Sequence, residues 1–336
     1  MGLETGSLAG ELWRNSGGQV DISVETILLT LAYISFALRI WSRSIQRAQY
    51  QLNDWLIVFV MFLTTIRYAV DVAVVVKCGL GLHIADVVAV GGPNILVLFS
   101  QLIYAIEIVF VICVALIKLS ILHFYSTIFL HRTFLVLIRM AMALCAVFLV
   151  ASLIATILSC NPPQKKWYPD TPGHCLNDQH VNFAIGTTDF ILDIVTFVLP
   201  LPILWKLQMP LMKKVGLSFI FGLGFAIIII TASRLQFFFT VTNDVTFTLW
   251  QAGVLSAVVP LLGIISANLP IMQPALKTSF LLFKDLGTTR STTREANRKM
   301  LVGHDSRRFR QLPEDSICLA TVEGENLSAT ACLATH

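Results

Sequence analysis

The sequence predicts an all-α membrane protein, built as a bundle of seven transmembrane helices. Three observations support this fold class. The chain of 336 residues is 56% hydrophobic and only 13% charged, whereas soluble domains contain about 25% charged residues. Its mean hydropathy is +0.76. Seven apolar segments also reach the length of about 20 residues that a transmembrane helix requires, which leaves no room for a separate soluble domain.

The seven segments follow one another along the chain. They are apolar all round, which distinguishes them from amphipathic helices that lie on a membrane surface. We expect helices near residues 22–41, 52–76, 95–122, 134–159, 183–205, 215–239 and 248–276. The chain therefore divides into an N-terminal segment 1–21, a seven-helix domain 22–276 and a tail 277–336.

The placement of Lys and Arg predicts the orientation, because cytoplasmic loops are enriched in these residues. Eighteen of the 24 lie in or beside the connections after the first, third and fifth segments, or in the tail. The other side carries Arg14, Lys77, Lys165 and Lys166. We therefore expect the N-terminus outside and the C-terminus in the cytosol. The tail is basic and poor in aromatic residues, so we expect it to be disordered past its first residues.

The cysteines predict one disulfide bond and no metal site. Cys160 and Cys175 flank the fourth connection, which lies on the outer side, where an oxidising compartment permits a bridge. Cys78 also lies near the outer surface and is an alternative partner. The other cysteines lie within segments or in the tail, where we expect free thiols. No Cys-x-x-Cys pair or His/Cys cluster suggests a metal ion.

Six ionisable residues lie well inside the apolar segments: Arg67, Asp71, Glu107, Asp189, Asp193 and Arg234. A charged residue at the centre of a membrane costs about 2.5–3.5 kcal/mol on insertion scales, so we expect these residues to pair or to line a wet cavity. Arg67 and Asp71 are four residues apart on one helix and can pair locally. Asp189 and Arg234 lie at matching depth on different helices, so we expect a second pair there. Two roles are open for such pairs. They take part in the function of the protein, or they have the purely structural role of fixing the register between helices.

Asp193 and Glu107 have no obvious cationic partner, so they are the candidates for acid–base catalysis and for a polar cavity. Gln101, Tyr104 and Glu107 recur every three residues, which indicates a polar stripe or simply hydrogen bonds between helices. The predicted ligand-binding residues are Gln101, Tyr104, Glu107, Asp189 and Asp193. Lys118, at the inner end of the third segment, is expected to extend to the membrane interface.

Several short motifs resemble, in order, those of the fungal rhodopsin-domain integral membrane proteins, the family of the satratoxin-cluster membrane proteins and related surface-sensing receptors. They are GLGLH at 79–83, VALIKLSILHFYSTIF, TTDFILDIVTFVLPLPILWKLQM, KKVGLSFIFGLGF, TASRLQF and GIISANLPIMQPAL. The outer loop shows the family's pattern at Cys160, Pro162, Trp167 and Cys175. The resemblance covers about residues 25–285. It implies a seven-helix fold, a receptor-like role and an association with secondary-metabolite gene clusters.

The sequence departs from this family and from retinal pigments in the seventh segment. The family often carries a Glu near the position of Val259, but QAGVLSAVVPLLGII contains no acid. Retinal needs a lysine in the middle of the seventh helix to form a Schiff base. Residues 248–276 contain no lysine, so we expect neither retinal nor another cofactor.

Three functions are compatible with these features. The first is a receptor-like protein that binds a small lipophilic ligand from outside and acts on a cytosolic signalling partner through its basic loops and tail. The second is a membrane-embedded enzyme that acts on a terpenoid or polyketide through unpaired carboxylates. The third is a transporter, although no internal repeat favours it. The lipid bilayer is the expected environment, either the plasma membrane or an endomembrane, and nucleic acid is not an expected partner.

Overall fold

The computed structural model describes residues 15–47, 49–82, 87, 92, 94–128, 131–168, 170–202, 211–237 and 250–272, with the backbone alone for 211–220 and 237. All of them belong to one compact unit, Met1–Leu281. The predicted tail 277–336 lies outside the described residues.

Seven helices are present in the described part of the chain. Six are long and apolar enough to cross a membrane: α2 (Ser16–Ile45), α3 (Leu52–Cys78), α5 (Asn94–Ile128), α6 (Arg132–Ile157), α7 (Asp178–Val198) and the final helix Trp250–Met272. The remaining helix is α9 (Leu211–Phe237), which comes before the final helix in the chain and contains the apolar stretch Phe221–Gln236. The predicted all-α, seven-helix membrane fold is thereby confirmed, and its orientation in the membrane stays a prediction.

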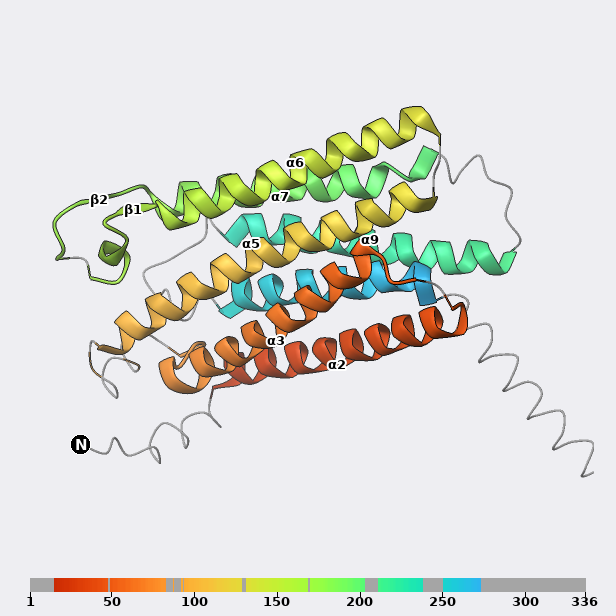
Figure 1. The fold of residues 1–336 in the computed structure, drawn as a ribbon. Coiled ribbons are helices and arrows are strands. Elements are labelled where there is room, and N and C mark those ends of the chain that lie inside the picture. The colour runs from red at the N-terminus through yellow and green to blue at the C-terminus, as the bar shows by residue number, and fades with distance from the viewer. Residues whose placement is uncertain are drawn as a thin grey trace, which may run out of the picture. The chain divides into compact units, whose positions relative to one another are not determined.

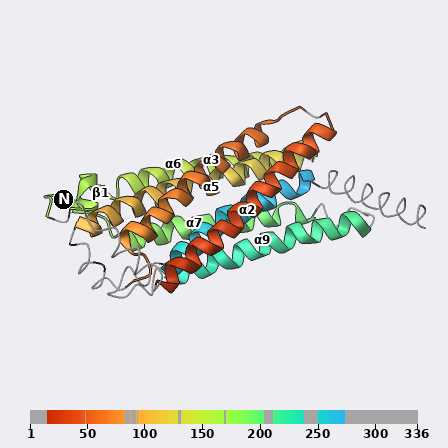
Figure 2. The same cartoon turned by 90° about the horizontal axis from the view of Figure 1, so that it is seen from below.

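The helices run alongside one another, with a small hairpin at the end where α2 begins (Figures 1 and 2). In this hairpin, β1 (Cys160–Asn161) pairs antiparallel with β2 (His174–Cys175). The short 3-10 helix η1 (Pro163–Lys166) connects the two strands. We call this end of the bundle the disulfide end and the other end the opposite end.

Residues of the GLGLH motif close the disulfide end between α2 and α3. Gly79 ends α3 in the left-handed conformation, with φ of 64°, which glycine adopts without steric cost. Gly81 has φ of 98°, and a Cβ built on it would lie 2.5 Å from Oδ1 of Asn15. Asn15 caps α2 by accepting from the amide of Gly18 at 2.9 Å, and its Nδ2 donates to the Leu80 carbonyl at 2.7 Å. The motif therefore holds the start of α2.

Helix α5 lies at the centre of the packing, since it contacts α3, α6 and α7. It contributes to all three apolar clusters: Val114 packs with α6 and α7, Ile117 with α2, α3 and the final helix, and Phe99 near the disulfide end. Large apolar side chains such as Leu144 are exposed on the outside of the bundle, as expected for a surface that faces lipid. Polar residues on α5 are therefore positioned to meet partners from several helices.

Candidate functional site

A disulfide bond closes the hairpin between α6 and α7. Cys160 and Cys175 face each other across β1 and β2 and are joined through their sulfur atoms, as the sequence predicted. Cys78, the alternative partner, is a buried free thiol. The bridge fixes both ends of the segment that contains η1, and η1 ends at Lys166. It therefore restricts where the Lys166 side chain can reach.

Lys166 extends from the hairpin to Glu107 on α5, with Nζ 3.1 Å from Oε2. Asn182 on α7 donates to the other carboxylate oxygen of Glu107 at 3.3 Å. The Lys166 Nζ also lies 5.1 Å from the centre of the Tyr104 ring. The ring of Trp167 packs against Tyr104, with 5.9 Å between their centroids. We call this group the loop site: Tyr104, Glu107, Lys166, Trp167 and Asn182.

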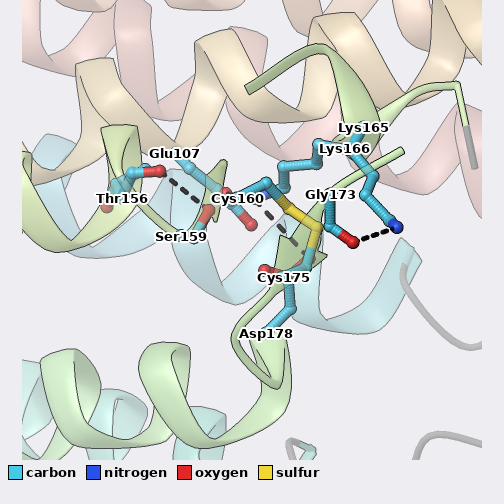
Figure 3. The surroundings of a disulfide bond; sticks show 9 residues. All are labelled: Glu107, Thr156, Ser159, Cys160, Lys165, Lys166, Gly173, Cys175 and Asp178. Carbon is cyan, nitrogen blue, oxygen red and sulfur yellow. Dashed lines mark hydrogen bonds and ion pairs between the residues drawn. A yellow bond between two sulfur atoms is a disulfide. The ribbon is translucent and has the colours of Figure 1, made fainter. Parts of the chain in front are cut away.

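The ion pair of the loop site is only partly buried. The side chains of Lys166 and Glu107 are 13% and 25% exposed, and Lys166 Nζ also lies 3.8 Å from Asp178, which is more exposed. The neighbouring Lys165 instead donates to the Gly173 carbonyl at 2.7 Å, and Figure 3 shows both lysines beside the disulfide. A small molecule could therefore compete with Glu107 for Lys166 without first unfolding the bundle.

A second lysine–carboxylate group lies between α5 and α7, away from the hairpin. Lys118 on α5 forms salt bridges with Asp189 and, at 3.0 Å, with Asp193 on α7. The Thr231 hydroxyl on α9 donates to Asp193 at 3.1 Å. The side chains of Lys118 and Asp189 are 5% and 1% exposed. We call this group the core site: Lys118, Asp189, Asp193 and Thr231.

The loop site and the core site lie on the same two helices. On α5, Glu107 precedes Lys118 by 11 residues, and on α7, Asn182 precedes Asp193 by 11 residues. At about 1.5 Å of rise per residue, the two sites are separated by roughly 16 Å along the helix axes. The same pair of helices therefore supplies residues to both sites.

The predicted location of Lys118 is wrong. Helix α5 continues to Ile128, ten residues past this lysine, so the side chain lies in the bundle and not at the membrane interface. The salt bridge that the structure shows for Asp189 is with Lys118, and the predicted pairing of Asp189 with Arg234 stays a prediction. The Arg234 guanidinium lies 4.0 Å from the centre of the Phe110 ring, where a cation–π contact forms.

The expected grouping of Asp193 with Glu107 in one polar cavity is wrong as well. Each carboxylate has its own lysine, and the two lie in different sites. Of the predicted polar stripe, Tyr104 and Glu107 both belong to the loop site. Gln101 is exposed on α5 and is not among the residues that Lys166 contacts in the described part of the chain. Only part of the predicted ligand-binding set is therefore brought together.

The local pair on α3 is present in the structure. Arg67 Nε lies 3.4 Å from Asp71 Oδ2, and Arg67 Nη1 donates to the Ser256 carbonyl of the final helix at 2.8 Å. Two further carboxylates from α2, Asp21 and Glu25, are buried nearby. Asp21 was not predicted to be buried because the first segment was expected to begin at residue 22, whereas α2 begins at Ser16. Glu25 lies inside that segment, only three residues from its expected start, and was not counted among the buried charges.

A polar network at the opposite end joins α2, α3 and the final helix. Arg39 donates from Nε and Nη2 to Asp54 at 2.9 and 2.7 Å, and from Nη1 to Asn268 at 3.2 Å. Ser42 donates to the Ile271 carbonyl at 2.6 Å. Arg39 was counted among the basic residues in or beside the connection after the first segment, yet this side chain is fully buried. Its place at the end of an apolar segment, with Asp54 at the start of the next, was the signal available.

Comparison with known proteins gives one family and several relatives. The chain is 26% identical over 212 residues to the polyenoic acids biosynthesis gene cluster protein Ba17b of Metarhizium anisopliae, which covers 62% of this chain and 57% of the relative. It is 29% identical over 161 residues to a SAT4 family membrane protein of Emericella nidulans, covering 47% and 41%. It is 37% identical over 86 residues to fugralins biosynthesis cluster protein 2 of Gibberella zeae, covering 25% and 21%.

Each of these alignments spans less than two thirds of the relative's own length. No solved structure matches the chain. The family model described as "Fungal rhodopsin domain" matches residues 38–278, which include the loop site, the core site and the network around Arg39. The chain therefore belongs to the fungal rhodopsin domain family of membrane proteins.

Proposed function

We propose that this membrane protein is receptor-like and recognises a small lipophilic carboxylic acid at the loop site. The observation that carries the proposal is the placement of Lys166. A hairpin held by a disulfide presents this lysine to Glu107, a carboxylate on the central helix of the bundle. Both side chains remain partly exposed, so an anionic ligand can replace one carboxylate by another.

The chemistry of the loop site favours an acid with a flat, unsaturated body. A ligand carboxylate would receive a charge-assisted hydrogen bond from Lys166 and a further one from the Asn182 amide. The rings of Tyr104 and Trp167 offer faces on which a conjugated or aromatic body can pack. Glu107 would be displaced and would turn toward water, to which it is already partly exposed.

The name of one relative supports the same ligand class. One is named as a protein of a polyenoic acids biosynthesis gene cluster, and another as a protein of a fugralins biosynthesis cluster. A polyenoic acid combines a carboxylate with an unsaturated chain, which matches a lysine beside an aromatic pair. We therefore place this chain in a secondary-metabolite setting, as a sensor of such an acid.

Binding at the loop site would act on the rest of the bundle through α5 and α7. Glu107 and Asn182 belong to these two helices, which meet again at the core site. A ligand that binds one arrangement of the helices better than another shifts the population toward it. The basic loops and the tail are then the proposed contacts for a cytosolic signalling partner.

The binding step is tested with cis-parinaric acid, a fluorescent conjugated fatty acid, and with its methyl ester, using the full chain in detergent or nanodiscs. Energy transfer from tryptophan reports binding. We expect tighter binding of the acid than of the ester, and we expect Lys166→Gln to remove this preference. Lys165→Gln is the matched control and should retain it, because Lys165 bonds to Gly173 instead. Equal binding of acid and ester by the unmodified chain would refute the proposal.

A membrane-embedded enzyme is the second candidate, favoured by the convergence of one lysine and two carboxylates at the core site. Burial and mutual ion pairing of these groups fit a structural role better than catalysis on a substrate. Comparing metabolites of a deletion strain with those of the parent separates the two candidates. Accumulation of one intermediate, together with loss of its product, favours the enzyme, whereas uniform loss of a pathway's products favours the sensor.

A further inference from the structure

Two arginines share one carboxylate where α2 ends and α3 begins, at the opposite end of the bundle (Figure 1). Arg39 and Arg43 lie four residues apart on α2, so they project from one face of the helix. Nη2 of Arg39 lies 2.7 Å from Oδ1 of Asp54, and Nη2 of Arg43 lies 3.2 Å from Oδ2. Asp54 is the only carboxylate that these arginines contact in the described part of the chain. The group therefore carries one positive charge in excess.

The two arginines differ in how fully their donors are used. Arg39 donates from Nε and Nη2 to Asp54, and its Nη1 donates to the Ala267 carbonyl at 3.1 Å. For Arg43, the one ion pair among the described residues is with Asp54, and its Nε is buried there without a hydrogen-bond partner. Oδ2 of Asp54 also accepts from the Gln51 amide at 2.9 Å. A guanidinium has five N–H donors, so most of the donors of Arg43 are unused.

Aromatic side chains on the surface place this end of the bundle at the level of the lipid headgroups. Trp41 near the end of α2, Tyr50 in the connection and Trp55 in the first turn of α3 are 42%, 59% and 68% exposed. Trp and Tyr side chains concentrate at the boundary between hydrocarbon and water. The Arg43 side chain is 10% exposed, so its unused donors lie just beneath this surface. The exposed Arg47 follows in the connection and adds positive charge there.

We propose that Arg43 binds the phosphate group of an acidic membrane lipid at the junction of α2 and α3. A guanidinium donates two parallel hydrogen bonds to a phosphate, which would engage donors of Arg43 that are unused. The phosphate would also neutralise the excess charge of the group. This end is predicted to face the cytosol, the side on which anionic lipids give a membrane its negative surface potential. The lipid site is separate from the loop site, so it goes beyond the proposed receptor function.

Thermal unfolding of the full chain in a neutral detergent tests the proposal. The probes are dioctanoyl phosphatidic acid, the matching diacylglycerol, which lacks the phosphate, and inorganic phosphate. We expect phosphatidic acid to raise the thermal midpoint in a concentration-dependent manner and diacylglycerol to leave it unchanged. Inorganic phosphate at the same concentration should have a much smaller effect, because it makes no contact with the exposed aromatic rings. No rise with phosphatidic acid would refute the proposal, and an equal rise with inorganic phosphate would assign the site to the free ion instead.

Two variants separate a specific site from a general attraction between charges. Arg43→Gln should weaken the binding of phosphatidic acid at least about tenfold, as expected when a hydrogen bond to a charged group is lost. Arg132→Gln is the matched control and should retain the affinity, because Arg132 is an exposed arginine that begins α6 at the same end of the bundle. Each midpoint is compared with that of the same variant without lipid, so a change in the stability of the free protein does not enter. Equal weakening in both variants contradicts a site at Arg43.

Native mass spectrometry provides a measurement that does not depend on any variant. The unmodified chain is released from micelles that contain equal amounts of phosphatidic acid and phosphatidylcholine with the same acyl chains. We expect the chain to retain one molecule of phosphatidic acid. The phosphate charge of phosphatidylcholine is balanced by choline, so this lipid should be retained less. Equal retention of the two lipids would overturn the proposal.

Discussion

Lys118 and Lys166 make similar contacts in different surroundings. Each forms a salt bridge with a carboxylate of another element. Lys118 on α5 binds Asp189 on α7, and Lys166 in the hairpin before α7 binds Glu107 on α5. Lys118 projects from the central helix into the bundle and meets two carboxylates there. Lys166 projects from a short hairpin and meets Glu107 at the disulfide end, where both side chains retain some exposure.

The difference in burial decides what each lysine can do. A buried pair is costly to break, because the partner left behind is a charge without compensation. A partly exposed pair loses little when it breaks, because water replaces the missing partner. The core site is therefore suited to hold α5 against α7, and the loop site is suited to exchange one anion for another.

The largest expected effect comes from Lys118→Met. The change leaves Asp189 and Asp193 buried without their cation, so we expect a loss of stability of about 3–5 kcal/mol. The amount of monodisperse protein in mild detergent and its thermal midpoint both report this loss. A triple variant that also carries Asp189→Asn and Asp193→Asn should recover part of it. A Lys118→Met protein with unchanged abundance and midpoint would contradict the buried role of this lysine.

The disulfide should have the next largest effect. Cys160 and Cys175 are 15 residues apart, and chain-entropy arguments give about 3 kcal/mol for a closed loop of this length. We expect Cys160→Ser with Cys175→Ser to lower the thermal midpoint and to weaken acid binding, because Lys166 loses its fixed position. A reducing agent should reproduce both effects in the unmodified chain and have none on the double variant. Unchanged binding after reduction would separate Lys166 from the bridge.

Asp193→Asn should have a smaller effect than Lys118→Met. Lys118 keeps Asp189 as a fully buried partner, and the amide can still accept a hydrogen bond from Thr231. Weakening one hydrogen bond to a charged group costs about 1.5–3 kcal/mol, and we expect the lower end because the local charge becomes balanced. Thermal midpoints of the two variants, measured side by side, provide the test. A loss equal to that of Lys118→Met would show that Asp193 and Lys118 cannot be treated separately.

Lys166→Gln should have the smallest effect on stability. A partly exposed ion pair contributes about 0–1 kcal/mol, so the thermal midpoint should stay close to that of Lys165→Gln. Acid binding should nevertheless fall in Lys166→Gln alone. Added salt should weaken binding in the unmodified chain, because it screens a partly exposed charge. If the thermal midpoint of Lys166→Gln were as low as that of Lys118→Met, both lysines would stabilise the fold to the same extent, contrary to this prediction.

The sequence by itself determined which parts of the chain form the seven helices and which local pairs form. Apolar length identified all seven helices, because the hydrocarbon core requires about 20 apolar residues of each. The pair of Arg67 and Asp71 followed from their spacing on one helix. The bridge between Cys160 and Cys175 followed from their positions at the two ends of one outer loop.

Only the tertiary structure decided how groups on different helices pair. Hydropathy varies along one dimension, so it does not show how far each helix is rotated about its axis or which neighbour it faces. Lys118 was expected at the membrane interface, but α5 extends ten residues past it to Ile128. The rotation of α5 about its axis directs the Lys118 side chain toward Asp189 on α7. Glu25 was expected three residues from the start of the first segment, whereas it lies more than two turns inside α2, which begins at Ser16 and packs beside α3. Depth in the membrane can be read from residue number, whereas the partner of a buried charge depends on the packing of whole helices.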